Sequence, residues 1–188
     1  MLTEITEADY GVEIDMVYAT DRVFTGKAVY GRGACFLHPE AAVLLRRAVD
    51  LAGRQGFRLR ILDAFRPSEA QWVLWNHTPD PAFISDPRRG SPHSMGVAVD
   101  LTLVDKASGE VLDMGTGFDD LRLQSHHGDT SISVEAQRNR LLLLGIMTAA
   151  DWDFFRNEWW HYQLFRPRGR YPVLTDSAAG TRLMPGAV

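Results

Sequence analysis

The chain has 188 residues, 45% of them hydrophobic and 23% charged, a composition that suits one folded domain and excludes a disordered chain. Its formal net charge of -4 excludes the broad basic surface that nucleic acids and anionic membranes attract, so we expect neither as a partner. The single cysteine, Cys35, excludes an intramolecular disulfide and a cysteine-rich zinc site. Because Cys35 lies in the apolar run ACFL, we expect a buried, inert thiol.

The N-terminal segment MLTEITEADYGVEID is acidic and lacks the positive start and apolar centre of a signal peptide. No apolar run reaches the roughly 20 residues that cross a bilayer. We therefore expect a cytoplasmic protein, although a precursor whose leader had been removed would have the same sequence. The sequence leaves the oligomeric state open.

The first regular elements are expected between residues 39 and 61. Pro39 and Glu40 are typical of a first helical turn, and Gly53 or Gly56 of a helix end. Apolar residues recur between them at helical spacing: Val43, Leu44, Ala48, Leu51 and Ala52. Residues 57–61 (FRLRI) then alternate strictly, which predicts a strand with one apolar face.

A second helix is expected from Pro67 to about His77, because Pro79 and Pro81 cannot continue it. After a loop over residues 78–92, the segment 96–103 (GVAVDLTL) alternates again. Its valines and leucines would face the core, and Asp100 would lie on the opposite face. The strand thus gives one carboxylate a definite direction.

The last elements are a helix over residues 133–149, with Leu141 to Leu144 in its buried stripe, and a strand over residues 159–165. Residues 166–188 are rich in proline and glycine and are expected to form an irregular tail. Strands separated by helices without regular βαβ alternation predict an α+β fold with a mostly antiparallel sheet flanked by helices. We expect a single domain over residues 1–188.

Three side chains suggest a metal site. His93 precedes Asp100 by seven residues, and Gly96 between them allows a turn that folds His93 back beside the carboxylate. His161, near the start of another strand, can supply a third ligand. Two imidazoles and one carboxylate suit zinc and leave its fourth tetrahedral position for water, as in catalytic rather than structural sites.

Two further residues suit catalysis around such an ion. Glu158 lies three residues before His161, so a bend at residues 158–160 would bring both side chains to one side and make Glu158 a general base. Arg66 follows a strand end, where its guanidinium could stabilise an oxyanion or hold a substrate carboxylate. Asp63 is equally well explained as a partner that orients Arg66 or as a plain ion pair.

These motifs resemble those of the D-alanyl-D-alanine dipeptidases of the vancomycin-resistance type, a family that shares its fold with hedgehog signalling domains. The pattern SxHxxGxAxD is matched by Ser91, His93, Gly96, Ala98 and Asp100, and the pattern ExxH by Glu158 and His161. The segments YATDRVFTGK, DAFRP, DMGTGFDD, AQRNRLLL and EWWHYQL also resemble dipeptidase segments in matching order, from residue 14 to residue 165.

The resemblance implies one Zn²⁺ per chain, held by His93, Asp100 and His161, and hydrolysis of the dipeptide D-alanyl-D-alanine, either to recycle D-alanine or to deplete a peptidoglycan precursor. It implies that Glu158 is the base and that Arg66 contacts the transition state. By the same resemblance, Asp119 would pair with the substrate's ammonium group. Ser91 and Tyr18 would hydrogen-bond its carboxylate.

Other interpretations stay open. A D,D- or L,D-carboxypeptidase acting on peptidoglycan peptides would use the same zinc site, as would a zinc-binding module without catalysis. Met95 stands where close relatives of the family usually have arginine, which puts the exact substrate preference in doubt. We interpret His126 and His127, in the turn-rich segment SHHGDTS, as solvated loop residues rather than ligands.

Overall fold

The helix and strand boundaries of the computed structural model, which describes residues 1–186, agree with most of the spacing in the sequence. The strands are Thr3–Ile5 (β1), Glu13–Ile14 (β2), Cys35–Leu37 (β3), Phe57–Asp63 (β4), Ala98–Asp105 (β5), Asp153–Phe154 (β6) and His161–Gln163 (β7). The α-helices are Glu7–Tyr10 (α1), Pro39–Arg54 (α2), Ser68–His77 (α3), Val134–Ala149 (α4) and Asp176–Ala179 (α5). Single 3-10 turns cover Val17–Ala19 (η1), Pro87–Arg89 (η2), His93–Met95 (η3) and Leu123–Ser125 (η4).

Side chains at the helix starts explain where the two long helices begin. The His38 ring accepts a hydrogen bond from the Glu40 amide at the start of α2, and Ser133 accepts one from the Ala136 amide at the start of α4. Some of the side chains predicted to form the buried faces of these helices are exposed instead. Ala48 and Ala52 are buried in α2 as predicted, but Leu45 replaces Val43, which is exposed, and Leu141 of α4 is exposed as well.

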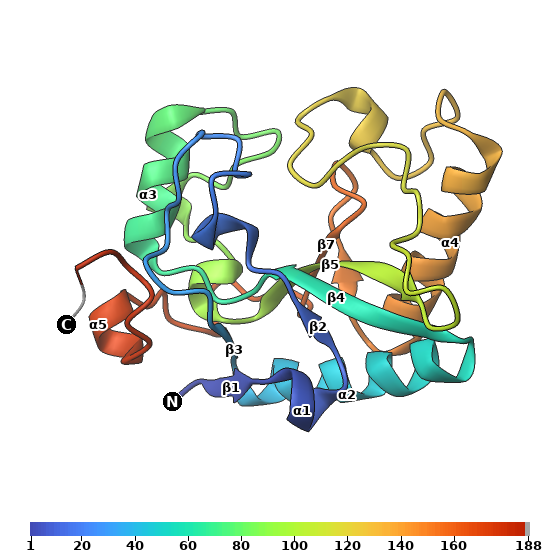
Figure 1. The fold of residues 1–188 in the computed structure, drawn as a ribbon. Helices are drawn as coiled ribbons and strands as arrows, with labels where there is room; N and C mark the ends of the chain where they lie inside the picture. The colour runs from blue at the N-terminus through green and yellow to red at the C-terminus, as the bar shows by residue number, and fades with distance from the viewer. Residues whose placement is uncertain (187–188) are drawn as a thin grey trace.

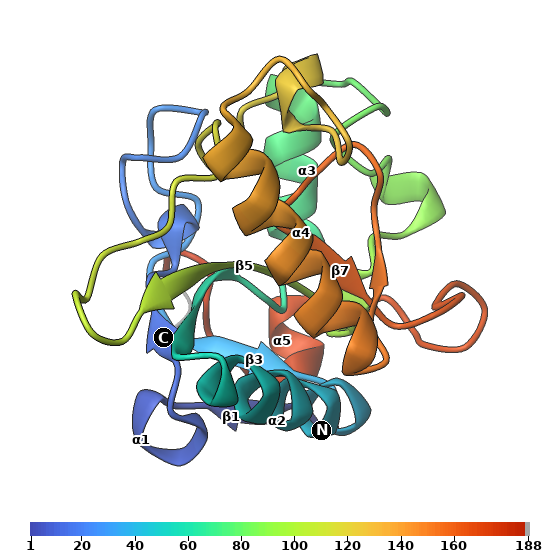
Figure 2. The same ribbon diagram turned by 90° about the vertical axis from the view of Figure 1, so that its right-hand side faces the viewer.

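The main sheet has five strands in the order β2-β4-β5-β7-β6. Only β2 and β4 pair in parallel; the other neighbours are antiparallel, and β1 and β3 form a separate antiparallel pair. The α+β fold with a mostly antiparallel sheet is therefore confirmed. Helix α2 runs below the sheet in Figure 1. Figure 2 shows α4 beside β7, with the C-terminal end of α4 nearer to α2.

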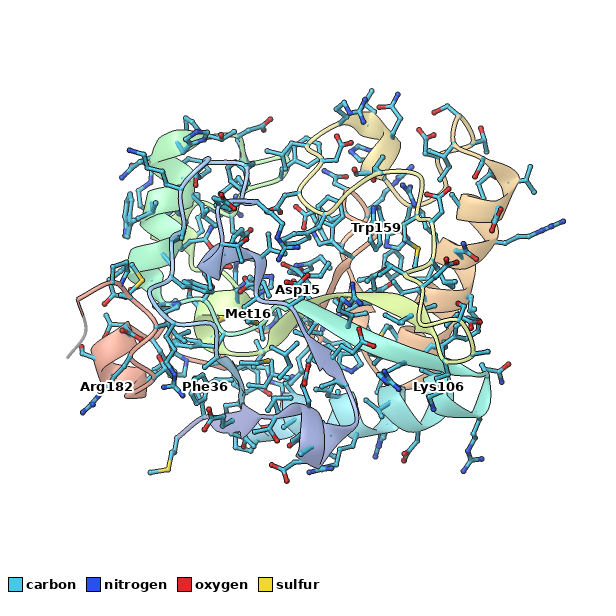
Figure 3. All side chains as sticks on the ribbon, in the orientation of Figure 1. Asp15, Met16, Phe36, Lys106, Trp159 and Arg182 are labelled. Atoms are coloured by element: carbon cyan, nitrogen blue, oxygen red, sulfur yellow. The ribbon has the colours of Figure 1, made fainter. Side chains whose placement is uncertain are left out.

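The two faces of the sheet are covered differently. Leu59, Ile61, Leu101 and Leu103 are fully buried and alternate with Arg60 and Thr102 on the other face. The segments 15–33, 78–92 and 106–133 rise on the side of the sheet away from α2 (Figure 1). Figure 3 shows side chains filling both sides, with Trp159 on the loop side. Every residue of β5 from Ala98 to Val104 is buried as a result.

The last expected strand is shorter than predicted, because residues 156–160 form turns and only His161–Gln163 pairs with β5. The segment expected to be an irregular tail contains α5, which the Asp176 carboxylate stabilises by accepting hydrogen bonds from Thr181 Oγ1 and the Leu183 amide. In the part of the chain that the structure describes, no helix is long and apolar enough to cross a membrane.

Candidate metal centre and substrate pocket

A row of polar side chains crosses three neighbouring strands on the loop side of the sheet. Asp100 of β5 is the direct pairing partner of Asp63 on β4 and of His161 on β7, and directly paired residues point to the same face. The pairing shifts by one residue between Ile61 and Asp63. This β-bulge at Leu62 turns Asp63 toward Asp100, whereas regular alternation would have placed it on the core face with Ile61.

His93 reaches the same point from the turn before β5. Gly96 ends that turn in the left-handed conformation, with φ of 72°, as its place in the sequence led us to expect. A Cβ atom at Gly96 would lie 2.8 Å from Leu2 Cδ2 and 3.3 Å from the His38 nitrogen, so space as well as conformation requires glycine. The His93 ring is 3% exposed and lies beside Asp100.

Three atoms of these residues form a nearly regular triangle. His93 Nε2 lies 3.0 Å from His161 Nδ1 and 3.3 Å from Asp100 Oδ1, and His161 Nδ1 lies 3.1 Å from Asp100 Oδ1. Ligand atoms roughly 2.0–2.2 Å from a tetrahedral zinc ion would be about 3.3 Å apart. The triangle therefore fits one small divalent cation above its centre, with a fourth position open.

The outer nitrogens of both rings have hydrogen-bond acceptors, and the inner nitrogens are directed at the triangle. His93 Nδ1 lies 2.7 Å from the Ala64 carbonyl oxygen, which can only accept, so Nδ1 carries a proton. His161 Nε2 lies 3.0 Å from Gln163 Oε1, which can accept in the same way. In the neutral form of each ring the inner nitrogen then has the lone pair, so that two nitrogens and a carboxylate oxygen converge on one point, an arrangement that suits a bound cation.

Arg66 lies beside this triangle in a network of hydrogen bonds. Its guanidinium donates from Nε to Asp63 at 2.9 Å, and its terminal nitrogens donate to Gln71 Oε1 at 3.0 Å and to the Tyr18 hydroxyl at 3.3 Å. The Tyr30 hydroxyl donates to Asp63 at 2.8 Å. Neither Tyr30 nor Gln71 was identified from the sequence, because nothing in their local pattern shows that they contact Asp63 or Arg66.

Glu158 lies where the expected bend places it. The turn is closed by hydrogen bonds from the Glu158 amide to the Phe155 carbonyl and from the His161 amide to the Glu158 carbonyl. One carboxylate oxygen lies 3.8 Å from His161 Nδ1, and the side chain is 7% exposed. Burial raises the pKa of Glu158 well above its usual value, and the charges of Asp100 and Asp119 raise it further.

These groups line a small cavity of about 120 Å³ that opens on the loop side of the sheet. Its lining includes every predicted site residue except Asp63: Tyr18, Arg66, Ser91, His93, Asp100, Asp119, Glu158 and His161. Since one water needs at least about 10–15 Å³ of such space, the cavity holds roughly ten water-sized groups. Two small residues fit a space of this size.

Three residues predicted to hold the substrate occupy different walls of the cavity. Ser91 and Tyr18 are buried, and each accepts one hydrogen bond, from the His93 amide and from Arg66. The Ser91 proton is left to donate, whereas the Tyr18 hydroxyl also acts on Asp119, whose pKa it lowers through a side-chain hydrogen bond. Asp119 has φ of 58°, and its enclosed Oδ2 has no hydrogen-bond partner among the described residues. Burial raises the pKa of Asp119 to about 8. An enclosed carboxyl oxygen without a partner suits an ammonium ligand, whose charge would favour the ionised form of Asp119.

The acidic side chains around the site also suit a cation. The carboxyl groups of Asp100, Asp119 and Glu158 line the cavity, and Arg66 pairs with Asp100 and with Asp63 behind it. Burial raises the pKa of Asp63, whereas the neighbouring histidines outweigh burial at Asp100 and lower its pKa. A bound cation would favour the ionised form of each buried carboxyl group near it.

The structure also places residues that the sequence interpretation set aside. His126 and His127 are half-buried rather than solvated, and the Nε2 atom of each is enclosed without a hydrogen-bond partner among the described residues; neither belongs to the triangle. Met95 is buried and does not line the cavity. Gln163, which the sequence analysis missed, lies two residues after His161, a spacing that puts both on one strand face.

Comparison with known proteins agrees with this geometry. The sequence pattern of the peptidase M15 family, described as D-ala-D-ala dipeptidase, matches residues 2–172. The chain is 44% identical to a D-alanyl-D-alanine dipeptidase of Escherichia coli K12, over 88% of this chain and 84% of that protein. It is 35% identical to a D-alanyl-D-alanine dipeptidase of Enterococcus faecium, over 86% and 90%, and 33% identical to one of Streptomyces coelicolor, over 85% and 89%. The chain belongs to the D-Ala-D-Ala dipeptidase family of peptidases.

Proposed function

We propose that the protein is a zinc-dependent dipeptidase that hydrolyses D-alanyl-D-alanine to D-alanine. The observation that carries the proposal is the triangle of His93 Nε2, Asp100 Oδ1 and His161 Nδ1, set in a cavity of dipeptide size with Glu158 beside it. The names of the curated relatives support the choice of dipeptide.

His93, Asp100 and His161 would hold one Zn²⁺ per chain. When bound, zinc polarises a peptide carbonyl and lowers the pKa of water, so that water can attack at neutral pH. The protein's own contribution would be to hold the proton of each neutral ring on its outer nitrogen, through the Ala64 carbonyl and Gln163, and to orient the rings. The two backbone-paired strands β5 and β7 hold Asp100 and His161 in register.

Glu158 would take the proton of the attacking water and pass it to the leaving amine. Its carboxylate makes no hydrogen bond with other described side chains, so it is free to receive and release a proton. The apolar rings of Trp159 and Trp160 are buried next to it, and exclusion of bulk water favours transfer between the reacting groups.

Arg66 would stabilise the negative charge that develops on the carbonyl oxygen. The guanidinium lies 3.5 Å from Asp100 Oδ2, the carboxylate oxygen outside the triangle, and it is paired with Asp63. A donor fixed in this way needs little reorganisation when charge develops. Asp63 is therefore proposed to position Arg66, with Tyr30 holding the second carboxylate oxygen.

The substrate termini would be held by the cavity walls. Asp119 would pair with the ammonium group, and the hydroxyls of Ser91 and Tyr18 would donate to the carboxylate. Because both termini of a dipeptide are charged, a small cavity with partners for both would favour it over longer chains. The cytoplasmic location and the role in peptidoglycan metabolism expected from the sequence remain predictions.

The experiment is metal analysis coupled to a hydrolysis assay. Purified protein should contain about one zinc per chain, release D-alanine from D-Ala-D-Ala, lose the activity with chelator, and regain it when zinc is added back. A muramyl pentapeptide ending in D-Ala-D-Ala serves as the comparison substrate. Cleavage of the pentapeptide alone would establish a carboxypeptidase instead, and metal binding without cleavage of either peptide would establish a binding module.

A further inference from the structure

Two arginines contribute to the cavity wall, and they differ in how fully their donors are used. Among the described lining residues, Arg66 and Arg168 are the guanidinium groups, and no lysine is present. Arg66 is 6% exposed, and its nitrogens already contact Asp63, Gln71 and Tyr18. It has few donor positions left for a carboxylate of the substrate.

Arg168 keeps more of its donors free than Arg66 does. Its Nε donates to the Gly90 carbonyl at 3.2 Å, and within residues 1–186 its terminal nitrogens form no hydrogen bond or ion pair. The side chain comes from the exposed segment after β7 and still lines the cavity. A guanidinium held through Nε presents its two terminal nitrogens as a fork, which matches a carboxylate.

The partner that anchors Arg168 is itself fixed. Gly90 has φ of 76°, and a Cβ atom there would lie 2.9 Å from Val173 Cγ2 and 3.0 Å from Met95 Cε. Met95 thus packs against the Gly90 backbone and supports the turn from within the core. Ser91, the next residue, is 2% exposed and lines the cavity. Arg168 is therefore attached one residue from the hydroxyl proposed to bind the substrate carboxylate.

We propose that Arg168 binds the C-terminal carboxylate of the dipeptide together with Ser91, and so makes a free carboxyl group a requirement for good substrates. The inference rests on the proposed function and adds the group that recognises one end of the substrate. Its counterpart is Asp119, whose enclosed Oδ2 has no hydrogen-bond partner among the described residues. A cavity that offers guanidinium donors on one wall and a carboxyl oxygen on another matches a zwitterionic ligand.

The test compares substrates that differ only in the terminal carboxyl group. Arg168→Met keeps the length of the side chain and removes the charge. For D-Ala-D-Ala we expect kcat/KM to fall about 10- to 100-fold, mostly through KM, as for loss of one charged hydrogen-bonding group. For D-Ala-D-alaninamide the wild type should already be that slow, and Arg168→Met should change it less than about threefold. Arg168→Lys should restore part of the loss for the acid.

Arg170→Met is the matched control. Arg170 lies in the same exposed segment and donates to the Phe165 carbonyl and the Tyr171 hydroxyl, but it does not line the cavity. We expect it to keep the wild-type ratio of acid to amide hydrolysis, and thermal unfolding should show both variants folded. If Arg168→Met also kept the wild-type ratio, Arg168 would not be the carboxylate partner.

A binding measurement separates this inference from the proposed function. Calorimetric titration of the zinc-loaded protein with the product D-alanine, which is not hydrolysed, reads the dissociation constant directly. D-Ala-D-Ala is titrated in the slow Glu158→Gln background, with and without Arg168→Met. Binding of these ligands that is about tenfold tighter with Arg168 than with Arg168→Met supports the carboxylate site. If no dipeptide is cleaved as well, the absence of cleavage defeats only the dipeptidase proposal. Equal binding by wild type and variant, alongside normal hydrolysis, would defeat only the inference.

Discussion

The candidate site has two parts that are held in place by different means. Asp63, Asp100 and His161 lie on three neighbouring strands and are aligned by the backbone pairing of the sheet. Ser91, Asp119 and Glu158 lie in turns and loops. The strand group supplies two of the three atoms of the metal triangle and their support, and the third, His93 Nε2, comes from the turn before β5. The loop group surrounds the space where the substrate would react.

The two groups therefore differ in function: the strand group would bind the metal, and the loop group would support catalysis. A ladder of antiparallel hydrogen bonds fixes side-chain direction, because a slip of one residue would turn every side chain to the other face. The loop residues depend on single contacts, such as the turn at Glu158 or the left-handed backbone of Asp119. We therefore expect substitutions in the strand group to change metal affinity, and substitutions in the loop group to change turnover with the metal retained.

The largest effect is expected at Glu158. Glu158→Gln keeps the shape and removes the proton acceptor, so kcat should fall about 10³- to 10⁴-fold. Zinc content should stay near that of the wild type, because the nearer carboxylate oxygen is 3.8 Å from His161 and outside the triangle. Steady-state kinetics with metal analysis measures both. Glu110→Gln, in an exposed loop, is the control; loss of zinc in Glu158→Gln would remove the distinction between the two groups.

Asp100→Asn tests the strand group. The amide keeps the size of the side chain but removes the negative charge at the triangle, and we expect zinc affinity to weaken on the order of 10²- to 10³-fold. Competition with a chromophoric chelator measures the affinity directly. Asp105→Asn, at the far end of the same strand, should leave it unchanged. If Asp100→Asn bound zinc normally and lost only turnover, the assignment of Asp100 to the metal would be wrong.

Gln163 is a further member of the strand group, and its substitution is expected to weaken zinc affinity less than Asp100→Asn does. Gln163→Leu removes the acceptor that keeps the His161 proton on Nε2, so zinc affinity should fall about 10- to 100-fold. Gln163→Glu keeps an acceptor at the same place and should retain the affinity. The visible absorption of the cobalt-substituted protein reports ligand geometry independently of activity. A spectrum and affinity unchanged in Gln163→Leu would show that the sheet alone orients His161.

The sequence predicts the strand group well because alternation is a local property. The pattern around Asp100 gave its direction, the glycine at position 96 gave the turn for His93, and the spacing of Glu158 and His161 gave the bend. The bulge at Leu62 was not predictable, because it exists only in the pairing of β4 with β5. Tyr30 reaches Asp63 across 33 residues of sequence, so its role was also out of reach of local pattern.

The loops account for most of the remaining differences. SHHGDTS is polar and rich in turn formers, which favours a solvated segment, yet His127 packs edge-on against Phe154 and near Tyr162. A polar composition does not reveal that a loop lies against a sheet edge. In the helices, an apolar side chain does not by itself show burial. Val43 is apolar but exposed, because the rest of the protein covers only part of the circumference of α2.

The smallest predicted effect tests whether the loop containing His127 is anchored to β6 and β7. Burial and the charge of Arg140 together lower the pKa of His127 to about 4. Below its ordinary pKa of about 6.5 the unfolded chain binds a proton that the folded protein excludes, so stability should decrease as the pH falls from about 6.5 to about 4. With allowance for partial exposure, the loss in the free energy of unfolding should be about 2 kcal/mol.

His127→Gln should remove that part of the pH dependence, as measured by urea unfolding of the metal-free protein at pH 7 and pH 4.5. His77→Gln, at an exposed position on α3, should not remove it. Equal acid sensitivity in the wild type and His127→Gln would mean that the loop opens freely and that His127 is solvated, as its sequence context had suggested.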